Sequence, residues 1–153
     1  MILLILGTHE QAFERALDRV LPIAAYQDLT IQHGHTPSRQ AGSRVTWTQF
    51  TTYEDMVALC RLARGVICHG GVGSIMTALS VGKAPVVIPR LAHYREHVDD
   101  HQLQIAAEFE RRGCAVMLGS DEGVASALVR AMALRARRVT SESLRRAVAA
   151  ASG

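Results

Sequence analysis

Short apolar runs alternate with amphipathic segments along the chain, and this alternation predicts strands and helices in turn. Strands are expected near residues 1–6, 29–33, 45–48, 65–68, 84–88 and 114–118. Amphipathic helices are expected between and after them, near residues 13–21, 53–63, 75–81, 98–112, 121–135 and 141–150. Short apolar strands in alternation with helices are typical of a parallel sheet covered on both faces. The pattern therefore predicts one Rossmann-like α/β domain over residues 1–153.

The expected helix ends are marked by residues with special backbone or capping properties. Pro22 follows the first helix, and Gly82 and Gly113 follow the third and fourth. Proline lacks the amide hydrogen that a helix interior needs, and glycine readily takes the left-handed conformation of a helix end. Asp121 is expected to cap the fifth helix at its start.

Composition is that of an ordinary folded protein, with 48% hydrophobic and 20% charged residues. The formal net charge of +3 is too small to indicate a nucleic-acid partner. Three widely spaced cysteines, Cys60, Cys68 and Cys114, are typical of a reducing compartment. The apolar start at residues 1–6 is too short for a signal peptide or a membrane span. We therefore expect a cytoplasmic protein.

Arginines make the C-terminal end of the chain basic, at positions 130, 135, 137, 138, 145 and 146. A solvated helix face explains this charge, and a contact with anionic lipid or with an acidic patch on a partner is the alternative. Aromatic residues do not interleave with these arginines, which disfavours nucleic acid as the partner.

Glycines crowd the turn between the expected strand at 65–68 and the helix behind it. The turn reads His69, Gly70, Gly71, Val72, Gly73 and Ser74. A strand, a tight turn and a helix direct backbone amides at an anion in front of the helix start. The dinucleotide-binding fingerprint would need a glycine at Met76, and no Gly-Lys-Ser/Thr of a nucleotide hydrolase follows. A phosphate site is favoured, and a tight turn without a ligand is the alternative.

A second polar loop follows the strand at 84–88. It contains Arg90, His93, Arg95, Glu96, His97, Asp99, Asp100, His101 and Gln102. Loops at the carboxyl ends of neighbouring parallel strands face one crevice, so both loops are expected to line one ligand site. His93, His97 and His101 would share a helix face and could bind zinc with Glu96 or Asp100. A polar loop that precedes the helix is favoured over this alternative, so no metal is expected.

These segments resemble the nucleotide-sugar-binding half of GT-B glycosyltransferases of family 28, related to the MurG C-terminal domain. The resemblance covers about residues 1–118, and residues 68–74, 78–79, 82–90 and 96–103 carry most of it. The likeness is strongest to stand-alone PssE-type subunits of bacterial exopolysaccharide synthesis. These are similar to the catalytic subunit of the two-part eukaryotic enzyme that adds the second N-acetylglucosamine to dolichol-linked sugar. Gly7 and Thr8, followed by Phe13, look like the family's first loop.

The resemblance implies a site for a UDP-sugar donor. The amides of residues 71–74 would hold the diphosphate, and Asp99, Asp100 and Gln102 match a family segment whose side chains meet the sugar and diphosphate. Asp100 stands where asparagine is common in relatives. The remaining donor-site residues implied are Gly7, Thr8, His9, His69, Gly70, Thr77, Arg90, Glu96 and His97.

Thr77 departs from the family pattern, because relatives usually carry glutamate there to hold the ribose hydroxyls. A neutral hydroxyl is a weaker partner than a carboxylate. The departure puts the usual way of holding the ribose in question. It also favours the alternative function, a non-catalytic nucleotide-sugar-binding or regulatory module.

The reaction implied by the resemblance is transfer of a hexose-type sugar with inversion at the anomeric carbon, without a cofactor. It needs a general base for the acceptor and positive charge or dipoles for the leaving diphosphate. The helix start would serve the diphosphate, helped by Arg90 or Arg95, and His9 is the local candidate for the base. The acceptor groove of two-domain relatives lies in their other half. A membrane-associated partner subunit with a lipid-linked acceptor is therefore expected, with the chain recruited to the inner face of the membrane. The sugar itself stays open among glucuronic acid, galactose, glucose and N-acetylglucosamine.

Overall fold

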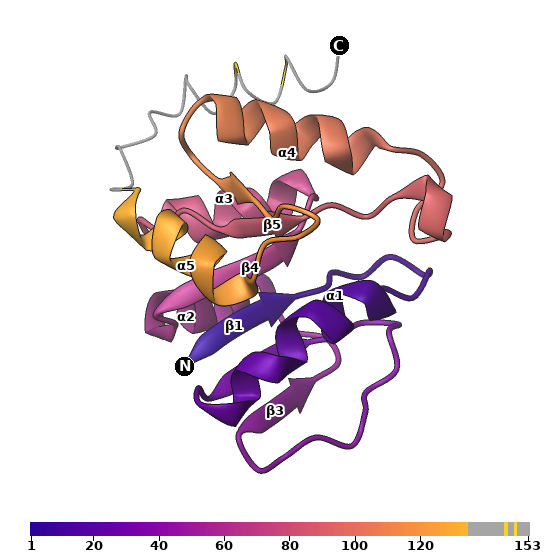
Figure 1. Cartoon of the computed structure of the whole chain (residues 1–153), viewed down its shortest axis with the longest axis vertical. Coiled ribbons are helices and arrows are strands. Elements are labelled where there is room, and N and C mark those ends of the chain that lie inside the picture. Colours follow the sequence, from indigo (N-terminus) through magenta and orange to yellow (C-terminus); the bar gives the residue numbers. More distant parts are fainter. Residues whose placement is uncertain (135–145, 147–148, 150–153) are drawn as a thin grey trace.

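A parallel sheet forms the centre of the molecule in the computed structural model, which describes residues 1–134, 146 and 149 (Figure 1). Its strands are β1 (Ile2–Ile5), β2 (Leu29–Gln32), β3 (Val45–Thr48), β4 (Gly65–His69), β5 (Val86–Ile88) and β6 (Val116–Met117). They lie in the order β3-β2-β1-β4-β5-β6, and every neighbouring pair is parallel. The predicted Rossmann-like parallel sheet is confirmed.

Helices connect the strands as the pattern predicts. They are α1 (Glu14–Val20), α2 (Tyr53–Leu62), α3 (Val72–Ser80), α4 (His101–Arg111) and α5 (Val124–Ala133), with short 3-10 helices η1 (Leu21–Ala25) and η2 (Ala92–Tyr94). None of the helices in the described part of the chain is long and apolar enough to cross a bilayer. The helix expected at 141–150 falls outside the described residues, apart from positions 146 and 149.

Each face of the sheet is covered by its own set of helices. Ile2 and Leu4 of β1 pack on one face with α1, η1 and α5, whereas Leu3 and Ile5 pack on the other with α2, α3 and α4 (Figure 1). Successive side chains of a strand point to opposite faces. Both faces of β1 are therefore buried, and for this reason it reads as an unbroken apolar run.

The fourth helix begins later than the sequence indicates, at His101 rather than Val98. Two carboxylates in the preceding loop bind backbone amides: Asp99 Oδ1 accepts from His101 N at 2.9 Å, and Asp100 Oδ1 accepts from Ala92 N at 2.9 Å. These bonds stabilise a loop conformation that competes with the helix. The histidines considered for zinc therefore do not share a helix face.

The start of α5 also differs from the prediction. The N-cap of α5 is Gly123 and not Asp121, because Glu122 orders the turn before it. The Glu122 carboxylate accepts from Gly119 N at 3.2 Å and pairs with Arg130 at 2.6 Å. Pro22 follows the end of α1 at Val20, as predicted, and lies at the start of η1, where its missing amide hydrogen costs nothing.

The topology leaves a crevice between β1 and β4, the two central strands. The connection after β1 leads to α1 on one face of the sheet, and the connection after β4 leads to α3 on the other face. The two loops therefore separate at the carboxyl edge of the sheet, which is where open α/β sheets bind their ligands.

The buried strand β1 provides a direct test of the core. Leu4 is 1% exposed, whereas Leu62 at the end of α2 is 74% exposed. Leu4→Ala should lower the free energy of unfolding by about 3 kcal/mol, because it removes buried contacts and leaves a cavity. Leu62→Ala, the matched control, should change it by less than about 0.5 kcal/mol in urea unfolding. Equal losses in the two variants would contradict this core assignment.

Candidate functional site

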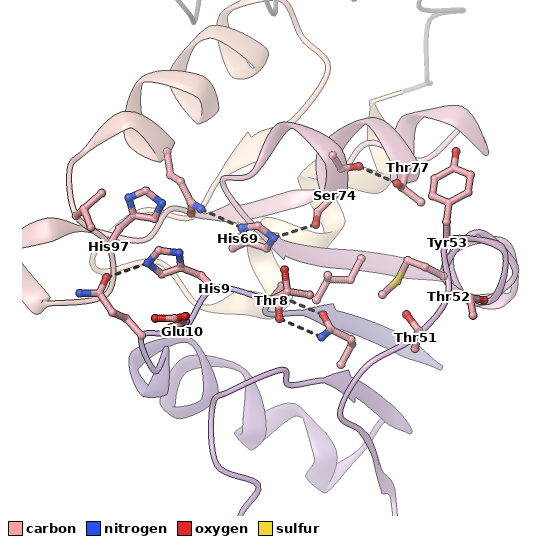
Figure 2. A pocket seen from close by; sticks show the side chains of 18 residues that line it. Thr8, His9, Glu10, Thr51, Thr52, Tyr53, His69, Ser74, Thr77 and His97 are labelled. Atoms are coloured by element: carbon pink, nitrogen blue, oxygen red, sulfur yellow. Dashed lines mark hydrogen bonds between the residues drawn. The ribbon is translucent and has the colours of Figure 1, made fainter.

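A cleft of about 810 Å³ opens at the carboxyl edge of the sheet, at the crevice between β1 and β4 (Figure 2). It is lined by the end of β1 and the loop after it, the end of β2, the loop between β3 and α2 with the first turn of α2, the end of β4 with the start of α3, and the residues around the start of α4. The side chains and backbone that line it are those of Ile5, Gly7, Thr8, His9, Glu10, Gln11, Gln32, Thr51, Thr52, Tyr53, Met56, His69, Gly73, Ser74, Thr77, His97, Val98 and Gln102.

The start of α3 faces this cleft with backbone donors that have no acceptor inside the helix. The first intrahelical bond of α3 runs from Ile75 N to the carbonyl of Gly71, at 3.2 Å. The amides of Val72, Gly73 and Ser74 precede that bond and are orphan donors. Because the cleft reaches Gly73 and Ser74, the partial positive charge of the helix end is directed into it.

The three glycines of the turn are needed for different reasons. A Cβ at Gly70 would lie 2.6 Å from the carbonyl oxygen of Gln102, and a Cβ at Gly71 would collide with the His69 ring. A Cβ at Gly73 would meet none of the described atoms within 4 Å. The first two glycines therefore permit protein packing, and the third leaves open space in front of the helix start.

The ring of His69 lies at the centre of the turn (Figure 2). Its Nδ1 is 3.1 Å from Gly71 N and 3.1 Å from Gln102 Nε2, and its Nε2 is 2.9 Å from Ser74 Oγ. Burial, assisted by the positive charge of Arg90, lowers the pKa of His69 to about 4. The ring is therefore neutral at pH 7 and supplies hydrogen bonds rather than charge.

Gln32, which sequence reasoning missed, holds the first loop of the site in place. Its carboxamide binds Gly7 in both directions: Gly7 N donates to Oε1 at 3.0 Å, and Nε2 donates to the Gly7 carbonyl at 3.0 Å. Nε2 also donates to the carbonyl of Gln49 at 2.9 Å. The sequence signal for this role is a glutamine at the end of an otherwise buried strand. A buried polar side chain needs hydrogen-bond partners, so a glutamine in this position indicates binding to a neighbouring loop.

Two histidines stack at the mouth of the cleft. The rings of His9 and His97 have centroids 4.5 Å apart and planes inclined by 19° (Figure 2). His9 Nε2 is 3.0 Å from Gln11 Oε1, which can only accept, so Nε2 carries a proton and Nδ1 keeps its lone pair. His97 Nδ1 lies 3.2 Å from Asp99 Oδ1. Within the described part of the chain, His9 Nδ1 has no hydrogen-bond partner.

Arg90 and Glu96 lie beneath the loops and do not line the cleft. Arg90 is 1% exposed, and its guanidinium donates to the carbonyl oxygens of Leu6 at 2.9 Å, Gln11 at 2.6 Å and Glu96 at 2.9 Å. The Glu96 carboxylate pairs with Arg15 at 2.8 Å. Burial lowers the pKa of Arg90 to about 10. The structure thus directs this arginine to backbone and not to the diphosphate position expected from the sequence.

Nine of the residues expected at the donor site line the cleft, and seven do not. Those that line it are Gly7, Thr8, His9, His69, Gly73, Ser74, Thr77, His97 and Gln102. The others are Gly70, Gly71, Val72, Arg90, Glu96, Asp99 and Asp100. Arg95, the second arginine considered for the diphosphate, borders a separate surface hollow beside Tyr94. Thr77 reaches the cleft, but its hydroxyl donates to the carbonyl of Gly73 at 2.7 Å.

The loop between β3 and α2, together with the first turn of α2, contributes a wall of the cleft that sequence reasoning missed. Thr51, Thr52, Tyr53 and Met56 line the cleft there. Thr52 Oγ1 accepts from Asp55 N at 3.1 Å and so caps α2. The Thr-x-x-Asp spacing of Thr52 and Asp55 resembles a capping box. This spacing indicates that the start of α2 lies at the same edge of the sheet as the start of α3.

Comparison with known proteins identifies the family. The chain matches the glycosyltransferase family 28 C-terminal domain over residues 1–150. It belongs to this family. Over 77 residues it is 34% identical to the UDP-N-acetylglucosamine transferase subunit ALG13 of Yarrowia lipolytica. That match covers 50% of this chain and 37% of the relative, so it spans little more than a third of the relative's length.

Solved structures show the same fold for this family 28 domain. The kitacinnamycin glycosyltransferase superposes with a TM-score of 0.67 at 21% identity, over 99% of this chain and 40% of that chain. SnogD, a glycosyltransferase from Streptomyces nogalater, superposes with a TM-score of 0.57 at 19% identity, over 99% of this chain and 39% of that chain. The chain therefore has the fold of one part of a GT-B glycosyltransferase and about two-fifths of the length of these proteins.

The cleft of this family 28 domain contains little formal charge. Among its lining residues in the described part of the chain, Glu10 is a carboxylate and there is no lysine or arginine. The described residues also include no group of three His, Cys, Asp or Glu side chains placed to hold a metal ion. Within this chain, an anion in the cleft would therefore be bound by backbone amides, hydroxyl groups and imidazoles.

The low pKa of His69 predicts an acid sensitivity that one substitution should reduce. Its pKa is about 4 in the folded protein, against 6.5 ordinarily, so the unfolded chain takes up the extra proton between these values. The contribution of His69 to the free energy of unfolding is complete above pH 6.5 and falls as the pH drops towards 4. His69→Asn keeps a hydrogen-bonding group without the titration. Urea unfolding at pH 4.5 and 7 should show a smaller pH-dependent loss in the variant, and an equal loss would contradict the assignment.

Proposed function

We propose that the chain is the donor-binding unit of an inverting glycosyltransferase, with a UDP-sugar as the donor and the acceptor site on a separate subunit. The observation that carries the proposal is the start of α3, whose orphan amides open into the cleft at the switch point of the sheet. Amides and the helix dipole together bind a diphosphate without a metal. Membership of family 28 supports a sugar nucleotide as the source of that diphosphate.

The two ends of the cleft differ in a way that orients this donor. On one side of the α3 start, Tyr53 offers apolar surface beside the hydroxyls of Thr51 and Thr52, which suits a nucleoside (Figure 2). On the other side, His9 and His97 face the opening. The sugar belongs at the histidine end, because a base must reach the acceptor hydroxyl that attacks the anomeric carbon.

His9 is the proposed base in this arrangement. Its Nδ1 would accept the proton of the acceptor hydroxyl as that oxygen forms its bond to the anomeric carbon. The bond from the anomeric carbon to the diphosphate oxygen breaks at the same time, and UDP leaves with the electron pair. The amides at the start of α3 would stabilise the charge that develops on the leaving diphosphate.

A curated relative supports the proposal of a partner subunit, because the similar protein from Yarrowia lipolytica is itself named a subunit. No lysine or arginine lines the cleft in the described residues, so a partner could also supply a cation. The proposed partner is membrane-associated, presents a lipid-linked acceptor of exopolysaccharide synthesis, and recruits this cytoplasmic chain to the inner face of the membrane.

The proposal predicts metal-independent binding of UDP at the start of α3. Calorimetric titration of the purified chain with UDP in the presence of a chelator should give saturable binding. Gly73→Val should weaken this binding at least about tenfold, because its side chain would fill the space that the diphosphate occupies. Unchanged binding in this variant would contradict the diphosphate position.

Gly123→Val is the matched control, since Gly123 lies at the start of another helix, as the N-cap of α5, and a Cβ there meets no described atom within 4 Å. It should leave UDP binding unchanged. A panel of UDP-sugars would then identify the donor. Absence of UDP binding both to the chain alone and to the co-expressed pair would contradict the proposed function. UDP-sugar binding without transfer by the pair would favour a non-catalytic module.

The role of His9 predicts a loss of turnover without a loss of donor binding. In the pair reconstituted with its acceptor, His9→Asn should lower the transfer rate about 100-fold or more, the usual contribution of a general base. UDP-sugar affinity should change less than about threefold. The matched control is His35→Asn, at an exposed histidine that does not line the cleft. Full activity of the His9 variant would place the base elsewhere.

A further inference from the structure

Gln102 binds three separate parts of the protein with one carboxamide. The residue is 6% exposed, and its Oε1 accepts from Gly70 N and from Arg90 N, each at 3.0 Å. Its Nε2 lies 3.1 Å from His69 Nδ1. A carboxamide oxygen has two lone pairs, so these amides occupy both of them. Gln102 therefore joins the turn after β4, the end of β5 and the start of α4.

These contacts determine the hydrogen-bonding state of His69. Its Nδ1 faces two donors, Gln102 Nε2 and Gly71 N, so it must carry a lone pair and the ring proton is on Nε2. Nε2–H then donates to Ser74 Oγ at 2.9 Å. Because Ser74 Oγ accepts this bond, it can donate its own hydrogen towards the cleft that Ser74 lines.

Close packing keeps the two loops in this register. A Cβ on Gly70 would lie 2.8 Å from the Gln102 Cβ as well as 2.6 Å from its carbonyl oxygen. The start of α4 therefore packs directly on the backbone of the turn, with no side chain between them.

We propose that Gln102 is a positioning residue for the diphosphate site, fixing the His69 tautomer and thereby the Ser74 hydroxyl and the amides at the start of α3. The proposal rests on the proposed donor site. It differs from the role implied by family resemblance, in which this glutamine meets the donor sugar. A positioning role affects UDP and UDP-sugar alike, whereas a sugar contact affects only UDP-sugar.

The tautomer can be measured without any ligand, by long-range ¹H–¹⁵N correlation on protein labelled at histidine. In the wild type, His69 should show a proton on Nε2 and an unprotonated Nδ1. In Gln102→Glu, one carboxylate oxygen still accepts from the amides of Gly70 and Arg90. The other oxygen replaces the Nε2 donor, so His69 Nδ1 then faces an acceptor. The ring should then bind a proton at Nδ1, and its titration midpoint should rise well above about 4. A wild-type proton on Nδ1, or an unchanged ring in the variant, would overturn the proposal.

Binding supplies the second measurement, with Gln102→Met as the variant. UDP and the preferred UDP-sugar should both lose affinity by the same factor, about tenfold, so that the ratio of their dissociation constants is unchanged. Unchanged UDP affinity with a loss for UDP-sugar alone would overturn the proposal. Gln104, exposed two residues further along α4, gives the matched controls Gln104→Glu and Gln104→Met. Neither control should alter the His69 signals or the binding.

The two measurements separate this proposal from the proposed function. If the wild-type chain and its pair with the partner bind no UDP, the donor assignment fails. The ring-nitrogen signals of His69 still decide whether Gln102 sets its tautomer. If UDP binds and the Gln102 variants leave both the signals and the affinities unchanged, the positioning role fails alone.

Discussion

The site depends on a conflict between backbone hydrogen bonding and ligand binding. Loops at the edge of a sheet must satisfy their polar groups, yet the amides at the start of α3 have to stay available to a ligand. Three buried polar side chains resolve this conflict. Gln32, Arg90 and Gln102 bind backbone atoms of the loops around the cleft and leave the first amides of α3 free. The loops are thus held in place before any ligand arrives.

This arrangement also explains the low formal charge of the cleft. Arg90 is close enough to lower the pKa of His69, but its guanidinium donates to the carbonyl oxygens of Leu6, Gln11 and Glu96. Its charge therefore stabilises the loops by charge-assisted hydrogen bonds. A diphosphate would be held mainly by dipoles and hydroxyls, which in the proposed transfer favours a second source of positive charge for the leaving diphosphate.

The fold could be predicted from the sequence because burial of both sheet faces leaves a simple pattern of apolar runs. The glycine turn could also be found, since its spacing at a helix start has a chemical reason. What the pattern did not reveal is where polar side chains point. Arg90 and Asp100 look like ligand contacts in the sequence, yet both bind backbone in the structure. Gln32 and Thr52 carried weak signals, because their roles depend on loops distant in sequence or on one capping bond.

The central claim, that the orphan amides of α3 hold the donor diphosphate, is tested most directly by backbone amide NMR. UDP would be titrated into the uniformly ¹⁵N-labelled chain in the presence of a chelator. The partner would be added if the chain alone does not bind UDP. The largest chemical-shift changes should fall on the amides of Val72, Gly73 and Ser74. Smaller changes are expected at the other amides of the turn that contains His69. Saturable binding that leaves these three amides unmoved and shifts another part of the chain would contradict the account.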